Sequence, residues 1–384
     1  MIKSQFLRKS FVILPLIIYL VINGLFIIKY GTFGLAGNAV LFGIYSGIIL
    51  LASVCANRIK LREVSLKYFF WAMVAVFFIF TLILNHYVKL ESLKVDRLDA
   101  LDMGIKAVLN GEYPYNQVNR LGNESSNLPV LILLGLPFYL LFGSAVYLQN
   151  FCFLLFSFIV FRYFSTYKAR IFALLLLIIS PGYLYELYVK SDLLSNFIIA
   201  AGFVLLIWNS FIKTSNLKLP VVAVCSALLV LTRIPVIIPL AIILVKKWIA
   251  LNLKNKIFFA SVFIITLATI IIAFTKLAPD FQVVMEHNPL QLQSKQPVFL
   301  SVFVIAAAVF FSFRVRDFVS VMLLSGLLLF GSVLISFLLA GIKNGLYNTY
   351  IGSYFDISHF NMAIPFIVIS LASGLLTTKD GTLK

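Results

Sequence analysis

The chain has 384 residues, of which 62% are hydrophobic and only 12% are charged. Soluble domains carry about 25% charged residues, so this composition excludes an ordinary soluble enzyme. So much apolar surface predicts lipid as the surrounding solvent. Because a membrane-spanning helix needs roughly 20 apolar residues, we expect an all-α polytopic transmembrane helical bundle with about twelve spans, forming a single integral membrane domain over residues 1–384.

The formal net charge of +17 does not indicate a nucleic-acid partner, because the basic residues are scattered through short connections. The cysteines, Cys55, Cys152 and Cys225, lie within apolar segments and predict neither a disulfide framework nor a metal site of their own. The first apolar run lacks a convincing cleavage site, so we interpret it as an uncleaved span.

Apolar segments follow one another along the whole chain. The predicted spans are 11–28, 37–55, 68–86, 128–164, 171–185, 192–210, 219–231, 234–246, 257–276, 297–313, 318–342 and 360–376. The fourth is too long for one straight span and contains Gly143 near its middle. We therefore expect one net crossing there, with 128–143 lying partly in the outer interface or re-entering the membrane.

Charge separates between the two sides of this layout. With the N-terminus inside, the inner connections hold 20 of the 31 basic residues and 3 of the 14 acidic ones, a net charge of +17. The outer connections hold the other 11 residues of each sign. An excess of Lys and Arg is typical of cytoplasmic connections. We therefore expect a multi-pass protein of a bacterial inner (plasma) membrane, with both termini cytoplasmic.

The largest outer connection, residues 87–127, shows the spacing of an amphipathic helix that lies on the outer leaflet. Smaller outer loops are expected at 277–296 and 343–359. Asn110-Gly111 predicts the end of the helix. One face of the helix is apolar, with Leu98, Leu101, Ile105, Val108 and Leu109, and the opposite face carries Asp96, Asp99, Asp102 and Lys106.

Three carboxylates spaced three residues apart repel one another, which raises carboxyl pKa values, as is frequent at catalytic sites. At least one of the three is therefore a candidate general base or metal ligand. The alternative is that all three only solvate an interfacial helix. A stiff aromatic turn, Tyr113-Pro114-Tyr115, follows the helix.

A second acidic feature is the segment SPGYLYELYVKSDLLSNF. Glu186 and Lys190 have the i, i+4 spacing of a helical ion pair, and Ser191 or Asp192 can cap the next helix. A carboxylate next to the membrane is costly unless it is paired or used. The segment thus predicts either a capped helix end or a second acidic contribution that faces the first loop.

Arg233, in LTRIPVIIPL, lies between two short apolar segments and is expected at membrane depth together with Pro235. An arginine near the centre of a membrane helix costs roughly 2.5–3.5 kcal/mol. An internal partner such as Glu186 or Asp192, or snorkelling to the surface, can offset this cost. The alternative is that Arg233 binds an anionic ligand such as phosphate.

The histidines, His86, His287 and His359, all fall near the outer surface in this layout. A histidine there is usually only solvated. Histidine and aspartate on one face also permit a divalent metal ion, so the cofactor is unknown and a metal ion stays an open alternative.

Together these motifs resemble the GT-C superfamily of glycosyltransferases, polytopic enzymes that use polyprenyl-phosphate sugars, and within it a bacterial mannosyltransferase-like branch. The matching elements are Asp96 or Asp99, Gly111, Pro114-Tyr115, Pro129 with LPFYLLFG, SPGYLYE with KSDLLSN, and TRIPVIIPL. The chain departs from the family where Asn127-Leu128-Pro129 replaces the usual Tyr-Pro-Pro. Its acidic loop also follows the third span instead of the first.

The resemblance implies transfer of a hexosyl or mannosyl group from a polyprenyl-phosphate donor to a hydroxyl of a glycan, lipid or protein acceptor, at the extracytoplasmic face, in a cell-envelope glycan. It implies a base at Asp96 or Asp99, with Asp102 as a third catalytic candidate. Glu186 and Asp192 would contact the acceptor or a metal, and Arg233 and Lys190 would contact the donor phosphate. The substrate loop would include Tyr113, Tyr115 and His359.

Two other function classes stay open. A flippase or transporter of lipid-linked glycans would need a polar path to the inner side, and the apolar segments contain few charged residues. A polymerase or ligase of such glycans also has a large outer loop, but tends to rely on Arg and His there, whereas this loop is rich in acids.

Overall fold

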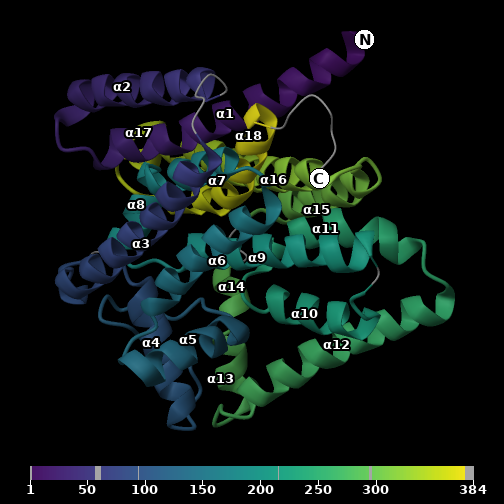
Figure 1. The fold of residues 1–384 in the computed structure, drawn as a ribbon. Coiled ribbons are helices and arrows are strands. Elements are labelled where there is room, and N and C mark those ends of the chain that lie inside the picture. Colours follow the sequence, from purple (N-terminus) through teal and green to yellow (C-terminus); the bar gives the residue numbers. More distant parts are fainter. Residues whose placement is uncertain (1, 57–61, 94, 215, 294–295, 377–384) are drawn as a thin grey trace. The chain divides into compact units, whose positions relative to one another are not determined.

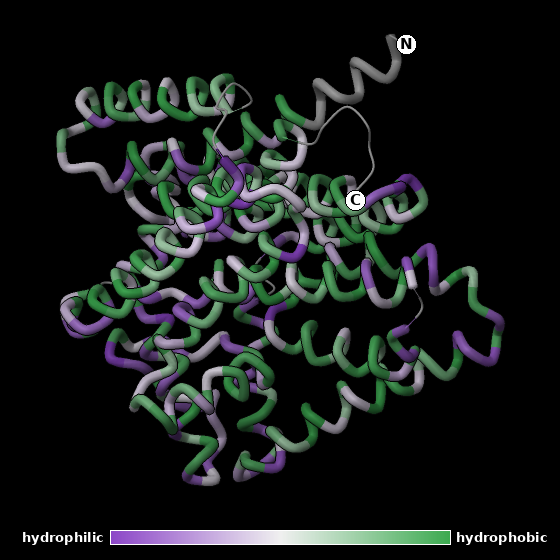
Figure 2. The backbone as a smooth tube through the Cα atoms, viewed as in Figure 1, coloured by the Kyte–Doolittle hydropathy of each residue, from purple (hydrophilic) through white to green (hydrophobic). Residues whose placement is uncertain are grey.

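The computed structural model describes residues 2–56, 62–93, 95–214, 216–293 and 296–376. Within these ranges the chain is built of helices and has no β-strand, which confirms the all-α prediction (Figure 1). The helices carry the hydrophobic residues, while many hydrophilic residues lie in the connections (Figure 2).

Seven helical segments in the described ranges are long and apolar enough to cross a membrane. They are Val12–Tyr30 of α1 (Ile2–Tyr30), α2 (Gly34–Cys55), α3 (Glu63–Tyr87), α9 (Leu193–Ile207) with the π-helical turn η2 (Trp208–Lys213), α12 (Leu253–Thr275), α16 (Phe318–Asn344), and η4 (Ile357–Ala363) with α18 (Ile364–Leu376).

Three bent helix pairs raise the number of candidate spans to ten. They are α5 (Pro129–Phe142) with α6 (Tyr147–Tyr163), α7 (Tyr167–Ile178) with α8 (Pro181–Tyr188), and α13 (Phe281–Glu286) and α14 (Pro289–Gln293) with α15 (Val298–Ser312). The two remaining predicted spans are the shorter helices α10 (Leu219–Val230) and α11 (Ile237–Ile249). Every predicted apolar segment is thus helical, while the total of about twelve spans stays a prediction.

The exposed faces of these helices need lipid. The most apolar window of α12 has a mean hydropathy of 2.7 and is only 6% buried, and that of α2 has a mean hydropathy of 1.9 and is 17% buried. Water cannot solvate such surfaces without a large free-energy cost. The chain is therefore suited to a bilayer as an integral membrane protein.

The chain divides into two compact units. The first comprises residues 1–80, 154–186 and 316–384, where α18 packs against α1, α7 and α16. The second comprises residues 81–153 and 187–315. In it α10 runs beside α12, α11 packs on α9 and α15, and α4 (Arg97–Leu109) packs on α5.

The predicted amphipathic helix is α4. Its residues Leu98, Leu101 and Ile105 are buried, in agreement with that part of the predicted apolar face. The prediction is wrong for Leu109, which is 48% exposed because it lies at the last residue of the helix, and Val108 is only half-buried. The helix ends at Asn110, and Gly111 follows with φ 74°, a left-handed conformation that glycine adopts without strain. This end agrees with the predicted stop.

Two helix breaks shape the second unit. Gly143, with φ 78°, separates α5 from α6, and their axes differ by 111°. Arg233 is extended between α10 and α11, followed by the short 3-10 turn η3 (Ile234–Val236). The Val130 N–H donates to the Leu231 carbonyl at 3.1 Å, so the start of α5 lies at the break between α10 and α11.

Candidate functional site

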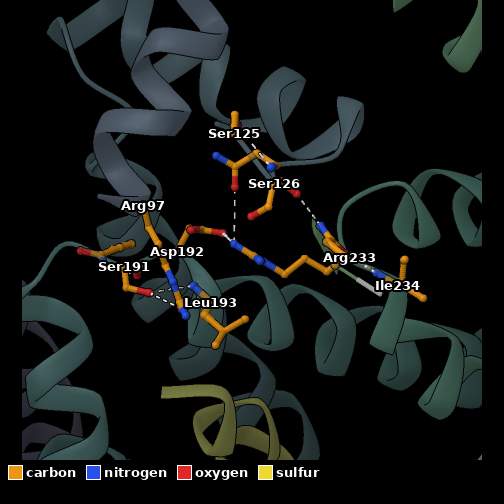
Figure 3. Close-up of polar contacts among 11 residues, drawn as sticks. Arg97, Ser125, Ser126, Ser191, Asp192, Leu193, Arg233 and Ile234 are labelled. Carbon is orange, nitrogen blue, oxygen red and sulfur yellow. Dashed lines mark hydrogen bonds and ion pairs between the residues drawn. The ribbon is translucent and has the colours of Figure 1, made fainter. Parts of the chain in front are cut away.

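A buried ion pair lies where α9 begins. Arg233 donates from Nη2 and Nε to Oδ2 of Asp192, at 2.5 and 3.2 Å, and the two side chains are only 8% and 6% exposed (Figure 3). Asp192 occupies the N-cap position of α9, yet its side chain makes no capping hydrogen bond. Arg233 thus has an internal partner, one of the alternatives that the sequence left open.

Two amide side chains frame this pair. Asn127 Oδ1 lies 3.5 Å from Arg233 Nη2. Gln293, the last residue of α14, donates from Nε2 to the Ser126 carbonyl at 2.6 Å and accepts from the Ile234 N–H at 3.1 Å. Gln293 therefore joins the residue before Asn127 to the residue after Arg233.

Helix α4 reaches the same place. Arg97, in its first turn, donates from Nη1 to the Ser191 hydroxyl at 2.9 Å (Figure 3). Gln149 of α6 donates to the Ser191 carbonyl. Ser191 directly precedes Asp192, so Arg97 brings the N-terminus of α4 to the start of α9. Arg97 and Gln149 are not among the predicted site residues, because only their long-range contacts reveal them.

The three loop aspartates have separate partners. Asp96 Oδ2 accepts from the side-chain amides of Asn119 and Asn123, at 2.8 and 2.7 Å. Asp99 Oδ2 accepts from the Arg120 N–H at 2.9 Å and lies 3.7 Å from Arg120 Nε. These two carboxylates are therefore held by the loop that follows α4.

Asp102 contacts the turn between α5 and α6. Its Oδ1 accepts from the Ala145 N–H at 2.7 Å and its Oδ2 from the Ser144 hydroxyl at 2.8 Å. Burial raises the pKa of the Asp102 carboxyl to about 6, and the charge of Asp99 adds to this rise, while the two hydrogen bonds and Lys190 oppose it. Like-charge repulsion contributes as predicted, but burial is the larger cause.

Asp99 and Asp102 line an open pocket of about 490 Å³ at the polar face of α4. Lys106 and Glu112 add charges of both signs, and Tyr139 contributes an aromatic ring. The pocket can hold a small polar group such as a sugar ring, because its wall offers hydrogen-bond donors, acceptors and an apolar surface.

Lys190 does not form the predicted helical pair with Glu186, because α8 ends at Tyr188. Lys190 itself has a left-handed backbone with φ 56°, and its ammonium donates to the Asn85 carbonyl at 3.1 Å. Burial lowers the pKa of Lys190, and the charges of Asp102 and Glu91 oppose this shift.

Glu186 and His359 belong to the first unit. Buried Glu186 accepts from Asn361 Nδ2 at 3.0 Å, and the same amide donates to the Gly182 carbonyl at 3.1 Å. His359 Nδ1 lies 2.9 Å from the Asp356 carbonyl oxygen, and its ring is half exposed. The assembly of these two residues with Arg233 in one site stays a prediction.

Tyr113 and Tyr115 are buried and pack edge to face, with ring centroids 5.2 Å apart. Burial raises the pKa of both hydroxyls. Enclosed rings favour a packing role for this turn. Their predicted role in the substrate loop stays a prediction.

The described residues do not fit a resident metal ion. Among them, no group of three or more His, Cys, Asp or Glu side chains is placed to hold one. His287 instead pairs with Glu124 at 2.8 Å. The loop carboxylates accept from amide and hydroxyl groups, and Asp99 lies 3.7 Å from the Arg120 guanidinium. No chemical step is therefore assigned to a metal.

Comparison with known proteins yields no match: no family model, no curated protein and no solved structure matches the chain.

Proposed function

We propose that the protein is a membrane glycosyltransferase that moves a sugar from a polyprenyl-phosphate donor to an acceptor hydroxyl at the extracytoplasmic face. One observation carries the proposal. Arg97 attaches the acidic helix α4 to Ser191, next to the buried Asp192–Arg233 pair. Candidate bases and a candidate phosphate-binding cation therefore come from one region of the second unit, as the resemblance to GT-C enzymes implies.

The reaction needs few catalytic groups, because the leaving group is already a phosphate. The base removes the proton of the acceptor hydroxyl while the oxygen attacks C1 of the sugar, and the bond between C1 and the phosphate oxygen breaks. The released polyprenyl phosphate keeps the bonding electrons. A guanidinium such as that of Arg233 stabilises this negative charge.

Free oxygen atoms identify the better base candidates. In Asp96 and Asp99, all hydrogen bonds within the described residues fall on Oδ2, which leaves Oδ1 for a hydroxyl. In Asp102 both oxygens accept from the α5–α6 turn. We assign the base to Asp96 or Asp99, and the anchoring of that turn to Asp102.

The other family roles complete the proposal. Asp192 and Glu186 orient the acceptor, Lys190 adds positive charge near the donor, and the polyprenyl chain lies between apolar helices. The active face is the periplasmic side of a bacterial inner membrane, with both termini in the cytoplasm.

The proposal is tested with purified protein in vesicles that contain polyprenyl-phosphate mannose and a lipid and glycan extract as acceptor. Asp96→Asn or Asp99→Asn should lower transfer by about 10²–10⁴-fold, the typical contribution of a general base. Glu91→Gln, at an exposed acid of the same loop, is the matched control and should keep full activity. Full activity in both aspartate variants contradicts the base assignment.

The same vesicles distinguish the other function classes. Uptake of the donor without release of polyprenyl phosphate would identify a transporter. A ladder of product lengths on a gel would identify a polymerase. A glycosyltransferase of the proposed kind gives one discrete product.

A further inference from the structure

Four buried polar side chains surround the start of α9: Asn127, Asp192, Asn196 and Arg233. Asn196 is 1% exposed and Asn127 is 2% exposed. Within the described residues, Asn127 Nδ2, Asp192 Oδ1 and both amide atoms of Asn196 have no hydrogen-bond partner. Buried polar groups in native proteins are almost always bonded. So many unbonded atoms around one ion pair indicate a site that takes a polar ligand.

Helix geometry places Asn196 beside Asp192. The Asn196 N–H donates to the Asp192 carbonyl at 2.9 Å, so the two residues are one turn apart on α9. Residues four apart share one face of a helix. Asn127, two residues before α5 begins, lies beside the same ion pair, because its Oδ1 is 3.5 Å from Arg233 Nη2. The unbonded atoms therefore belong to one site.

The chemistry of this site suits an anion. Arg233 supplies a positive charge, and its Nη1 has no hydrogen-bond partner within the described residues. Asn127 Nδ2 and Asn196 Nδ2 are further unbonded donors. The N-terminus of the 15-residue helix α9, where Asp192 makes no capping hydrogen bond and the Ser191 hydroxyl accepts from the Leu193 N–H at 3.4 Å, adds a favourable dipole. A cation would be repelled by Arg233.

We propose that the Asp192 carboxylate is an internal stand-in for a phosphate group, which displaces it from Arg233. Asp192 contacts the Arg233 guanidinium through one oxygen only, because Oδ2 accepts both hydrogen bonds. The phosphodiester of a polyprenyl donor offers two unesterified oxygens, each of which can accept more than one hydrogen bond, enough for a bidentate contact with Arg233 and for both asparagine amides. The displaced carboxylate can turn toward Arg97, which already contacts the neighbouring Ser191.

The inference deepens the proposed function, on which it rests for the identity of the ligand as the phosphate of a polyprenyl donor. In the resting protein, Asp192 neutralises Arg233 and avoids an unpaired buried charge. Donor binding then exchanges one anion for another, so little charge is left uncompensated at any step.

The test measures binding of citronellyl phosphate to the full chain in detergent micelles by calorimetry, with inorganic phosphate and citronellol as comparison ligands. Asp192→Asn removes the competing anion and should bind citronellyl phosphate at least several-fold more tightly than the wild type. Arg233→Gln should lose binding. Asn196→Ala should weaken it about fivefold, the value of one hydrogen bond. Ser195→Ala, at an equally buried neighbour, is the control.

The direction of the Asp192→Asn effect decides the outcome. Equal or weaker binding in this variant overturns the proposal, as does equal binding of citronellol, which would show an apolar contact only. Preference for citronellyl phosphate supports a lipid-borne phosphate, and equal binding of inorganic phosphate supports the exchange with free phosphate as the ligand.

A folding defect does not remove the test. If Asp192→Asn is unstable, its thermal midpoint should rise more on addition of citronellyl phosphate than that of the wild type, because the ligand restores the missing negative charge. Absence of this larger rise overturns the proposal. These readouts involve no sugar transfer, so loss of the proposed function and loss of the exchange are separately detectable.

Discussion

Arg97 Nη1 donates to the hydroxyl of Ser191 at 2.9 Å, across 94 residues of sequence. This hydrogen bond joins the first turn of helix α4 to the residue before Asp192. Asp96, the N-cap residue of α4, is therefore linked to the Asp192–Arg233 pair through its chain neighbour Arg97 and the Arg97–Ser191 hydrogen bond. The acidic loop is thus part of the second unit and not a separate appendage.

The Asp192–Arg233 pair should show strong energetic coupling. Removing one partner leaves a buried charge uncompensated, so Arg233→Gln should lower the free energy of unfolding by about 3–5 kcal/mol. The double variant Asp192→Leu with Arg233→Met should regain most of this loss, because it buries no charge. Denaturation in mixed micelles measures both.

A partly exposed ion pair supplies the comparison for these variants. Asp99→Asn removes the charge that faces Arg120, where the side chains are 22% and 25% exposed, and should cost at most about 1 kcal/mol. A loss in Arg233→Gln no larger than that in Asp99→Asn would contradict strong coupling.

Asp102 should make stability depend on pH. Because its pKa is raised to about 6 in the folded protein, the folded state binds the proton more tightly than the unfolded chain does. The stabilising effect of protonated Asp102 is therefore complete below the unfolded pKa of about 4 and is lost as pH rises through 6. Asp102→Asn should flatten the thermal midpoint between pH 4 and 6.5.

The control for this pH dependence is Asp99→Asn, which lies one turn away on the same helix and should keep most of the slope. An unchanged slope in Asp102→Asn would assign the pH dependence to another group.

Short-range patterns predicted the helices well. The 3–4-residue spacing of Leu98, Leu101 and Ile105 identified the buried face of α4, and Gly143 identified the break between α5 and α6. These features depend on neighbours within a few residues, so periodicity and glycine conformation determine them. The number of spans does not follow from such patterns, because bends such as that of 111° between α5 and α6 divide one apolar run into two helices.

The partners of the site residues could not be predicted in the same way. Arg233 reaches Asp192 over 41 residues and Gln293 reaches Ser126 over 167 residues. No local pattern encodes such contacts. One signal for Asn196 was present: a polar residue in an apolar run, four residues after Asp192, predicts a shared helix face.

The predicted orientation is testable by cysteine labelling. In a background without Cys55, Cys152 and Cys225, new cysteines at Glu91 and Asp280 should react with a membrane-impermeant maleimide added outside intact cells, and one at Lys254 should react only after permeabilisation. All three native residues are exposed in the structure, so membrane sidedness should govern the difference. Labelling of the Lys254 position from outside would reverse the charge-based topology.

Gln293 should act as a positioning residue for Arg233. Its amide joins the Ser126 carbonyl to the Ile234 N–H, so Gln293→Ala removes two hydrogen bonds worth about 0.5–1.5 kcal/mol each. Hydrogen exchange at Ile234 should become faster, and citronellyl phosphate should bind several-fold more weakly.

A nearly isosteric substitution separates positioning from packing. Gln293→Glu keeps the acceptor for the Ile234 N–H but loses the donor to Ser126, so Ile234 should stay protected while the link to Ser126 is broken. Gln291→Ala, two residues earlier in α14, controls for general loosening of that short helix. If Gln291→Ala weakens phosphate binding as much as Gln293→Ala does, the effect belongs to α14 as a whole and not to the hydrogen bonds of Gln293.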